Sequence, residues 1–320
     1  YLNPNNFLGG AIKLDVQRAR DHIKAQVADP LGLSVEDAAA GVIELLDLTL
    51  SEYLRANISA RGYNPIEFVC FSYGGAGPVH TYGYTAGVGF KDVVVPAWAA
   101  GFSAFGCACA DFEYRYDKSV DLGVPQLAPD AEKIAACKTL QSAWETLATK
   151  VIEEFVINGF KPEDVLLIPG YKMQYMGQLN DLEIISPVSN ASTAADWHKI
   201  IEAFENMYGR VYANSARSPE LGYSVTGAIM RGTVPTQKPV LPEDKDEGPV
   251  PPADARIGTR PFYRHKKWVD AVIWKMESLK AGNHIVGPAI IESDATTFVV
   301  PTGFETRVDK HRLFHLIETK

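Results

Sequence analysis

The spacing of apolar residues in the first sixty positions predicts two consecutive helices. Apolar side chains recur every three or four residues across 12–27, which is the period of one helix face. Asp29-Pro30 is predicted to end this helix, because the residue before a proline avoids helical backbone angles. Ser34, followed by Asp37, resembles a capping box and predicts a second helix that extends to about residue 60.

A glycine-rich turn then joins a predicted strand to a third predicted helix. Residues 68–71 form an apolar run typical of a strand covered on both faces in a parallel sheet. Gly74-Gly75-Ala76-Gly77 follows, and Pro78 stands where a proline favours the first turn of a helix. Residues 93–95 predict a second buried strand. The small residues of 97–110, interspersed with aromatic rings, predict a helix packed closely against the sheet.

The pattern changes after Asp111 and predicts a second domain. Strand, helix, three strands and helix are expected in that order at 112–116, 130–158, 165–168, 172–176, 182–185 and 193–208. Proline and acidic residues predict an extended connector within residues 235–262, and short strands with turns are expected after it. The fold class predicted is α/β, with a first domain at 1–125 and a mixed α+β domain with a β-rich C-terminus at 126–320.

Composition and charge narrow the possible partners. The 320 residues are 46% hydrophobic and 22% charged, as in an ordinary globular protein. The net charge of −8 disfavours nucleic acid or an anionic membrane, because no basic stripe is present to neutralise phosphates. No apolar stretch reaches the ~20 residues of a membrane helix and no signal peptide is evident, so a cytoplasmic protein is expected. Four cysteines without CxxC spacing favour a reducing compartment and predict no metal site.

The glycine-rich turn is the sharpest candidate for chemistry. Consecutive glycines after a strand let a ligand approach the main chain, and the next helix would point free N–H groups at it. A nucleotide is the natural ligand, although a purely structural turn has the same pattern. The segment matches neither a Walker loop nor a GxGxxG fingerprint. His80, in the first turn of that helix, is either a nucleotide contact or a packed hydrogen-bond anchor.

No catalytic residue can be assigned from motifs. Ser103 lies outside any GxSxG elbow, and HExxH and acidic calcium-loop patterns are absent from the sequence. The acidic residues Asp111, Glu113 and Asp117 are best explained as a solvated strand face. The segments 175–178 and 231–232 are interpreted as parts of the β architecture.

Four blocks, in order, carry a family resemblance. They are 5–10 (NNFLGG), 72–80 with its GGAGPVH core, 94–111 with VVP, SAFG and AD, and 287–301 with GPAIIE and TTFVVP. Together they resemble the hydantoinase A family, which includes ATP-dependent hydantoinases, 5-oxoprolinases and the acetone and acetophenone carboxylases. The resemblance covers nearly the whole chain.

The resemblance implies half of an actin-like ATPase fold, in which two lobes close on ATP. Gly74, Gly75, Ala76 and Gly77 would line the adenosine, together with Pro78 and His80. The family's phosphate-binding DxGGT turns are absent from this sequence, and a typical member is about twice as long. The chain therefore resembles the C-terminal half. Either the N-terminal half is a separate polypeptide or it has been removed, and the length suggests a small subunit of acetophenone carboxylase.

By this resemblance the chain would be active only with partner subunits, one of which carries the N-terminal half of the ATPase fold. ATP would activate a ketone and bicarbonate by phosphoryl transfer, with Mg²⁺ held largely by a partner. Residues Tyr175-Met176-Gly177-Gln178 depart from the more usual RYxGQ pattern of the family. The alternatives are the C-terminal part of an ATP-dependent hydantoinase or 5-oxoprolinase, and a scaffold subunit that binds no nucleotide.

Overall fold

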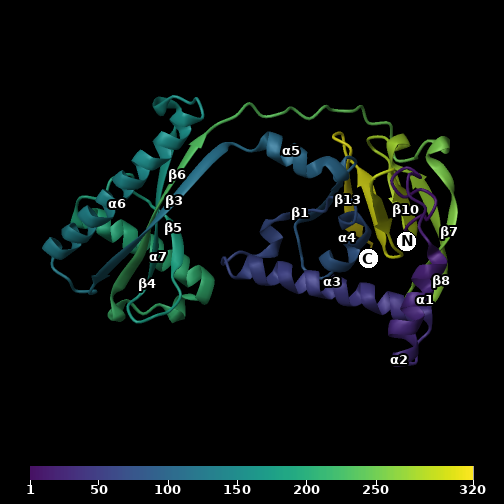
Figure 1. The fold of residues 1–320 in the computed structure, drawn as a ribbon, viewed down its shortest axis with the longest axis horizontal. Coiled ribbons are helices and arrows are strands. Elements are labelled where there is room, and N and C mark those ends of the chain that lie inside the picture. The colour runs from purple at the N-terminus through teal and green to yellow at the C-terminus, as the bar shows by residue number, and fades with distance from the viewer. Residues whose placement is uncertain (320) are drawn as a thin grey trace. The chain divides into compact units, whose positions relative to one another are not determined.

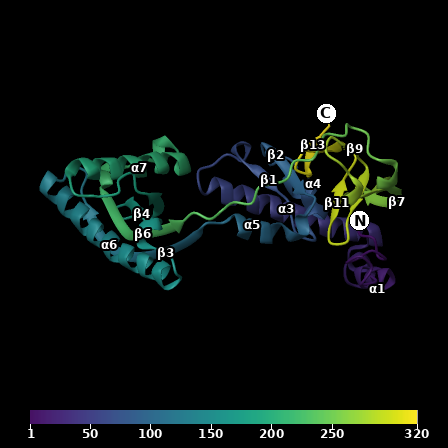
Figure 2. The same ribbon diagram turned by 90° about the horizontal axis from the view of Figure 1, so that it is seen from above.

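The computed structural model describes residues 1–319 and divides into two compact units (Figures 1 and 2). The first unit comprises Tyr1–Ser59, Asn64–Ala108 and Pro239–Lys320, and the second comprises Ala60–Tyr63 and Cys109–Lys238. This division differs from the predicted domains 1–125 and 126–320. The physical reason is strand pairing: the final strand inserts beside a strand from the first hundred residues, so the C-terminal segment belongs to the first unit. The predicted mixed α/β class is confirmed.

Two sheets form the first unit. Strands β1 (Val69–Phe71), β2 (Asp92–Pro96), β13 (Leu313–Glu318), β12 (Phe304–Val308) and β9 (His284–Val286) form one sheet in that order. Strands β11 (Thr297–Val300), β10 (Ala289–Glu292), β8 (Lys267–Lys275) and β7 (Arg256–Arg264) form the other. The β1–β2 and β8–β10 pairs are parallel, and the remaining pairs are antiparallel. Side chains such as Val95, Phe298 and Phe314 fill the core of this unit.

The helices of the first unit are α1 (Val16–Ile23), the π-helical turn η1 (Lys24–Ala28), α2 (Asp29–Leu31), α3 (Val35–Ser59), α4 (Gly77–Thr85) and α5 (Phe102–Cys109). The predicted stop at Asp29-Pro30 is wrong. Pro30 lies in the first turn of α2, where a proline is tolerated, and the chain leaves the helix at Gly32 with φ +65°. The second predicted helix is confirmed as α3, and the backbone N–H of Asp37 donates to Ser34 Oγ at 3.0 Å.

Two predictions about burial in this unit are wrong. Strand β1 is not covered on both faces, because Val69 and Phe71, which share one face of the strand, are exposed. Helix α5 carries no buried residue, although Phe102 stacks on Phe71 with ring centroids 5.3 Å apart. The small residues of this helix therefore do not mark the close helix-to-sheet packing that the sequence suggested.

The second unit is an antiparallel sheet with two helices. Its strands run in the order β3 (Phe112–Val124), β6 (Tyr223–Val234), β4 (Leu166–Tyr175) and β5 (Leu182–Ile185). Helices α6 (Asp130–Ile157) and α7 (Ala194–Tyr212) bury Trp144 and Trp197 in the core of this unit. Two predicted strands at 165–168 and 172–176 are one strand, β4, which shifts register between Lys172 and Met173.

Short segments complete the chain. The 3₁₀ turns are Pro65–Glu67, Ala99–Gly101, Pro162–Asp164, Asn214–Ala216, Pro219–Leu221, Ala253–Ala255 and Met276–Ser278. No helix or strand occurs at 235–252, which agrees with the predicted connector. The connector does not reach residue 262, because β7 begins at Arg256. The predicted β-rich C-terminus is confirmed by β7 to β13.

Candidate functional site

Three segments that are distant in sequence surround one cavity of about 310 Å³ in the first unit. They are the N-terminal segment, the glycine turn with the start of α4, and the turn between β10 and β11. The lining residues are Leu2, Asn3, Asn6, Phe7, Leu8, Gly75, Ala76, Val79, His80, Glu292, Ser293, Asp294, Ala295, Thr296 and Thr297. These segments include parts of three of the four blocks that carry the family resemblance, so a signal spread along the sequence converges in space.

The glycine turn is fixed between β1 and α4 by short-range contacts. Gly74 has φ +86°, a value that glycine adopts without strain, and its N–H donates to Ala99 O at 2.8 Å. Ser72 and Thr81 share a buried hydroxyl–hydroxyl hydrogen bond of 2.6 Å. Pro78 occupies the first turn of α4, as predicted. The turn therefore presents Gly75 and Ala76 to the cavity from a fixed strand and a fixed helix.

Thr296 joins the glycine turn to the opposite wall. Its hydroxyl lies 3.0 Å from Gly74 O and 3.2 Å from Gly75 O, and it donates to these two carbonyl groups. A Cβ on Gly75 would lie 3.3 Å from Ala295 O, closer than most side chains tolerate. The absence of a side chain at Gly75 therefore permits the two turns to pack together.

The turn that carries Asp294 is itself ordered by Ser293. The Ser293 hydroxyl accepts from the N–H of Thr296 at 3.1 Å, and the Thr296 carbonyl closes the turn with the N–H of Ser293 at 3.0 Å. Gly9 packs on the Asp294 side chain, since a Cβ there would lie 3.1 Å from Asp294 Cγ. Asp294 is thereby held at the cavity wall by backbone geometry on both sides.

A second carboxylate, Glu292, is almost fully buried at the same wall. Only 4% of its surface is exposed, and its oxygens accept from Arg260 Nη2 at 2.5 Å and from Asn3 Nδ2 at 3.5 Å. Burial of a carboxylate is tolerated when a charged partner and hydrogen bonds satisfy it. Arg260 therefore holds Glu292 in place from behind the cavity.

His80 is oriented by a buried carboxylate from another helix. Its Nδ1 lies 2.9 Å from Oδ1 of Asp47, which is on α3 and is 5% exposed. With the Nδ1 proton donated to Asp47, the Nε2 atom of the ring is the one left for a ligand. Gly83, one turn further along α4, leaves the space that Asp47 occupies. Of the two roles predicted for His80, the structure shows the hydrogen-bond anchor. The same hydrogen bond to Asp47 holds the His80 ring in the cavity wall.

The charges of the cavity lining select the kind of ligand. Asp294 and Glu292 are acidic, and neither lysine nor arginine occurs among the lining residues. Carboxylates accept hydrogen bonds from hydroxyl groups and repel phosphates at close range. The cavity therefore suits an uncharged, hydroxyl-bearing group, with Phe7 and Val79 available for its apolar surface.

The structure divides the six predicted binding residues into two groups. Gly75, Ala76 and His80 line the cavity, whereas Gly74 and Gly77 shape the turn without lining it, and Pro78 is buried. Sequence reasoning missed Asp294, Thr296 and Asp47 as site residues. The first two lie in or beside a block that was recognised, but nothing in the sequence indicates that this block meets the glycine turn.

Removing the Thr296 hydroxyl tests whether it joins the two turns. Thr296→Val is expected to destabilise β1 and α4 by about 1–2 kcal/mol, because two partly buried carbonyl groups lose a donor. Hydrogen exchange of the amides in these elements measures the change. Thr139→Val is the matched control, since the Thr139 hydroxyl bonds Ala135 O on an exposed face of α6 and should cost under about 0.5 kcal/mol. Equal losses in both variants would contradict the role of Thr296.

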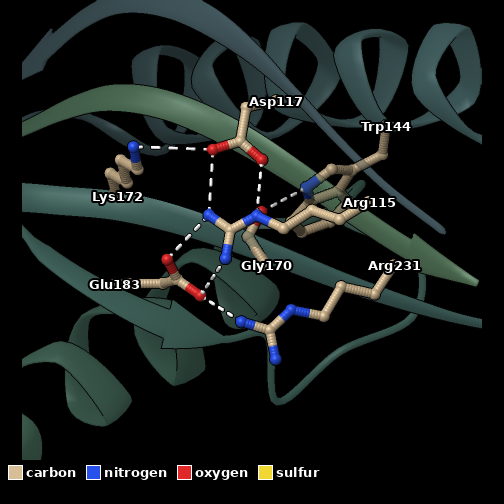
Figure 3. Close-up of polar contacts among 7 residues, drawn as sticks. All are labelled: Arg115, Asp117, Trp144, Gly170, Lys172, Glu183 and Arg231. Atoms are coloured by element: carbon tan, nitrogen blue, oxygen red, sulfur yellow. Dashed lines mark hydrogen bonds and ion pairs between the residues drawn. The ribbon is translucent and has the colours of Figure 1, made fainter. Parts of the chain in front are cut away.

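A second polar cluster lies on the sheet of the second unit (Figure 3). Arg115 makes paired contacts with Asp117, at 2.7 and 2.9 Å, and with Glu183, at 3.0 and 2.8 Å. Arg231 also contacts Glu183, and Lys172 lies 3.5 Å from Asp117. The side chains are 29–39% exposed, and their charges are satisfied by one another. This cluster agrees with the predicted solvated face at Asp117 and stabilises the sheet.

The other residues considered from the sequence have structural contacts. Asp111 pairs with Lys238, and Gln178 donates to the Tyr208 hydroxyl at 2.8 Å. Tyr175 is fully buried in the core of the second unit. All four cysteines are free, and burial raises the pKa of the Cys70 and Cys137 thiols to about 11. Within residues 1–319, no cluster of three metal-binding side chains occurs, and no helix is long and apolar enough to cross a membrane.

Comparisons with known proteins give consistent matches along the chain. The family model described as hydantoinase/oxoprolinase matches residues 1–116, and the hydantoinase/oxoprolinase C-terminal domain matches residues 127–319. The chain is 69% identical to the acetone carboxylase beta subunit of Xanthobacter autotrophicus, over 99% of this chain and 44% of that protein. It is 32% identical to the acetophenone carboxylase gamma subunit of Aromatoleum aromaticum, over 98% of this chain and 42% of that protein.

Solved structures agree with these sequence matches. A nucleotide-free structure of acetone carboxylase is similar with a TM-score of 0.71 and 69% identity, covering 99% of this chain and 45% of that chain. The ATP-dependent caprolactamase of Pseudomonas jessenii shares the fold with a TM-score of 0.82 and 24% identity, over 99% of this chain and 45% of that chain. The chain thus spans less than half the length of these relatives. The length argument for a small acetophenone carboxylase subunit fails, because the matching subunit is more than twice as long.

Proposed function

Since this chain belongs to the hydantoinase/oxoprolinase family, we propose that it forms part of an ATP-dependent carboxylase of the acetone carboxylase type. The identity of 69% to an acetone carboxylase beta subunit, against 32% to an acetophenone carboxylase subunit, favours acetone over acetophenone as the substrate type. The carboxylase would act with further subunits, as the word subunit in the names of both relatives implies.

Within that assembly, the cavity between the glycine turn and Asp294 would bind the nucleoside end of ATP. The observation that carries this proposal is the acidic, cation-free lining beside a glycine turn with no side chain at Gly75. Asp294 would accept hydrogen bonds from ribose hydroxyls, and the base would pack on Phe7 and Val79. The lining offers no side chain to neutralise a triphosphate, so the phosphates would extend away from it.

The first unit would then be one part of an actin-like ATPase fold, and the phosphate contacts would come from polypeptide outside this chain. Mg²⁺ bound with ATP is coordinated mainly by phosphate oxygens, waters and one or two carboxylates, so it would lie with the phosphates. The metal would therefore be held elsewhere in the assembly.

The chemistry proposed is phosphoryl transfer that activates a ketone and bicarbonate before they join. Such transfer depends on positioning and on charge neutralisation more than on a protein nucleophile. The contribution of this chain would be to fix the nucleoside: Thr296 holds the glycine turn, Arg260 holds Glu292, and Asp47 orients His80. Positioning groups of this kind set where the reacting phosphate lies.

Nucleotide titration of the complete assembly tests the proposal. Asp294→Ala and Gly75→Val are each expected to weaken ADP binding by about tenfold or more, because one removes a hydroxyl acceptor and the other fills the turn. The same variants should weaken adenosine binding by the same factor. If they disturbed a phosphate contact instead, adenosine binding would be unchanged, because adenosine has no phosphate. The control is Asp254→Ala, an exposed aspartate of the first unit away from the cavity. Unchanged ADP affinity in both cavity variants would favour the scaffold alternative.

The hydantoinase or oxoprolinase alternative is separated by the substrate that stimulates ATP hydrolysis. Stimulation by acetone with bicarbonate is expected for the proposed carboxylase, whereas stimulation by a lactam or cyclic imide would support the alternative. Lactams are included in this assay because the chain is 28% identical to a caprolactamase subunit of Pseudomonas jessenii.

A further inference from the structure

The outward face of helix α3 is apolar, which is the reverse of the pattern expected for a helix at a protein surface. Six large apolar side chains of this helix are exposed: Val42, Leu45, Leu46, Leu48, Leu50 and Tyr53. Four of them share one face by their spacing, at positions 42, 45, 46 and 53. The opposite face, turned into the first unit, buries Asp47 and Ser51. A helix with this pattern is typical of one that packs against protein on both faces, with the first unit on one side and another chain segment on the other.

Strand β1 presents an open edge in the same unit. It is the outermost strand of its sheet and pairs in parallel with β2. The N–H of Ser72 donates to Val94 O at 2.8 Å, and Phe68 O accepts from Lys91 N at 2.9 Å, so the even-numbered residues face β2. Backbone groups alternate sides in a parallel ladder, and those of Val69 and Phe71 therefore point to the open edge.

The side chains of β1 are more exposed than is usual for a parallel strand. Val69 is 42% exposed and Phe71 is 41% exposed. Parallel strands are almost always covered on both faces, whereas these two side chains share one face of β1 and are partly open to solvent. Figures 1 and 2 both draw β1 beside α3, and both elements belong to the first unit.

We propose that the α3 face and the β1 edge form one docking surface for the remainder of the family polypeptide, meaning the part of the longer relatives that this chain does not match. The relatives align with 98–99% of this chain but only 42–44% of their own length, so more than half of their sequence has no counterpart here. That remainder contributes at least one strand beside β1 and an apolar cover for α3. It is the same occupant whether it is joined to this chain or is a separate polypeptide.

The inference deepens the proposed function, because the same remainder is expected to supply the phosphate contacts. The glycine turn directly follows β1, so a strand added beside β1 would extend the same sheet that carries the turn. The docking surface would thereby fix the distance between the nucleoside cavity and whatever residues hold the phosphates. Docking itself requires no nucleotide, so it can be measured independently of ATP chemistry.

Co-expression of two polypeptides tests the docking surface. This chain is produced with the non-matching part of the Xanthobacter autotrophicus acetone carboxylase beta subunit, and the mass of the complex is measured by light scattering without nucleotide. A one-to-one complex is expected. Hydrogen exchange of the Val69 and Phe71 amides should slow by about a hundredfold or more when an added strand accepts their hydrogen bonds. The paired substitution of Val42→Asp with Leu45→Asp should weaken the complex by about a hundredfold, because two charges would be buried.

Matched controls keep the result interpretable. Leu127→Asp with Leu179→Asp places the same charges on side chains that are 91% and 97% exposed in the second unit, and should leave the affinity unchanged. Thermal unfolding must be the same in both double variants and the parent, since the four side chains are exposed. Absence of a complex, an undiminished affinity in the α3 variant, or a self-dimer formed through α3 would overturn the proposal. If the complex forms as expected but does not bind ADP, only the proposed function is refuted and the docking surface stands.

Discussion

Replacing Gly83 with alanine is expected to lower the free energy of unfolding of the first unit by about 3 kcal/mol. A Cβ at this position would overlap the Asp47 carboxylate and lie 2.8 Å from Asp47 Cβ. Either α3 moves away from α4, or Asp47 changes rotamer and leaves His80. Both responses leave a buried carboxylate without the hydrogen bond that satisfies it. Denaturant unfolding, followed by hydrogen exchange in α4, measures the loss.

Two further variants isolate the contact between Gly83 and Asp47. Gly106→Ala is the matched control, because a Cβ on this α5 glycine meets nothing within 4 Å and should stabilise the helix by about 0.5–1 kcal/mol. In an Asp47→Ala background, the added cost of Gly83→Ala should fall below about 1 kcal/mol, since the overlapping atoms are gone. If Gly83→Ala costs the same with and without Asp47, the close approach of the two helices is not what requires the glycine.

Trp144→Ala is expected to destabilise the second unit by about 4 kcal/mol, the largest effect of any single substitution proposed for this chain. Trp144 on α6 is 1% exposed, and its indole Nε1 donates to Gly170 O on β4 at 2.7 Å (Figure 3). The substitution removes the side chain that joins the helix to the centre of the sheet. It also leaves a cavity that the surrounding residues fill only in part. Thermal and denaturant unfolding of the intact chain give the change in free energy.

A graded series separates packing from hydrogen bonding at this position. Trp144→Phe retains most of the apolar surface and should cost about 1–2 kcal/mol, because mainly the hydrogen bond to Gly170 is lost. Trp268→Ala is the control for loss of a tryptophan at a site that is 56% exposed, and should cost less than about 1 kcal/mol. Similar losses for the two alanine variants would contradict the assignment of Trp144 to the core.

Local sequence signals predicted the helices and most strands well. The α3 helix was predicted within one residue at each end, because both the cap at Ser34 and the apolar period lie within a few residues of what they specify. The burial of β1 was predicted wrongly for the opposite reason. An apolar run indicates that a strand should be covered, but the cover must come from other chain segments, and the segments that the structure describes leave Val69 and Phe71 exposed.

The candidate site shows the same division between local and distant information. The turn chemistry of the glycine segment was enough to find Gly75, Ala76 and His80. Asp47 was not found, because a single acidic residue within an amphipathic helix looks like a surface charge until α4 is placed against it. Asp294 and Thr296 required knowledge that the turn after β10 meets the glycine turn, and no spacing rule relates segments more than two hundred residues apart.

The placement of β13 between β2 and β12 has a consequence for how the chain is synthesised. At a typical ~5–20 residues per second, β13 leaves the ribosome tens of seconds after β2. The second unit is encoded almost entirely between them, by residues 109–238, and can fold while the sheet of the first unit still lacks its central strand. The nascent chain would therefore hold the edge of β2 that β13 later covers unpaired during this interval, when chaperone binding is most needed.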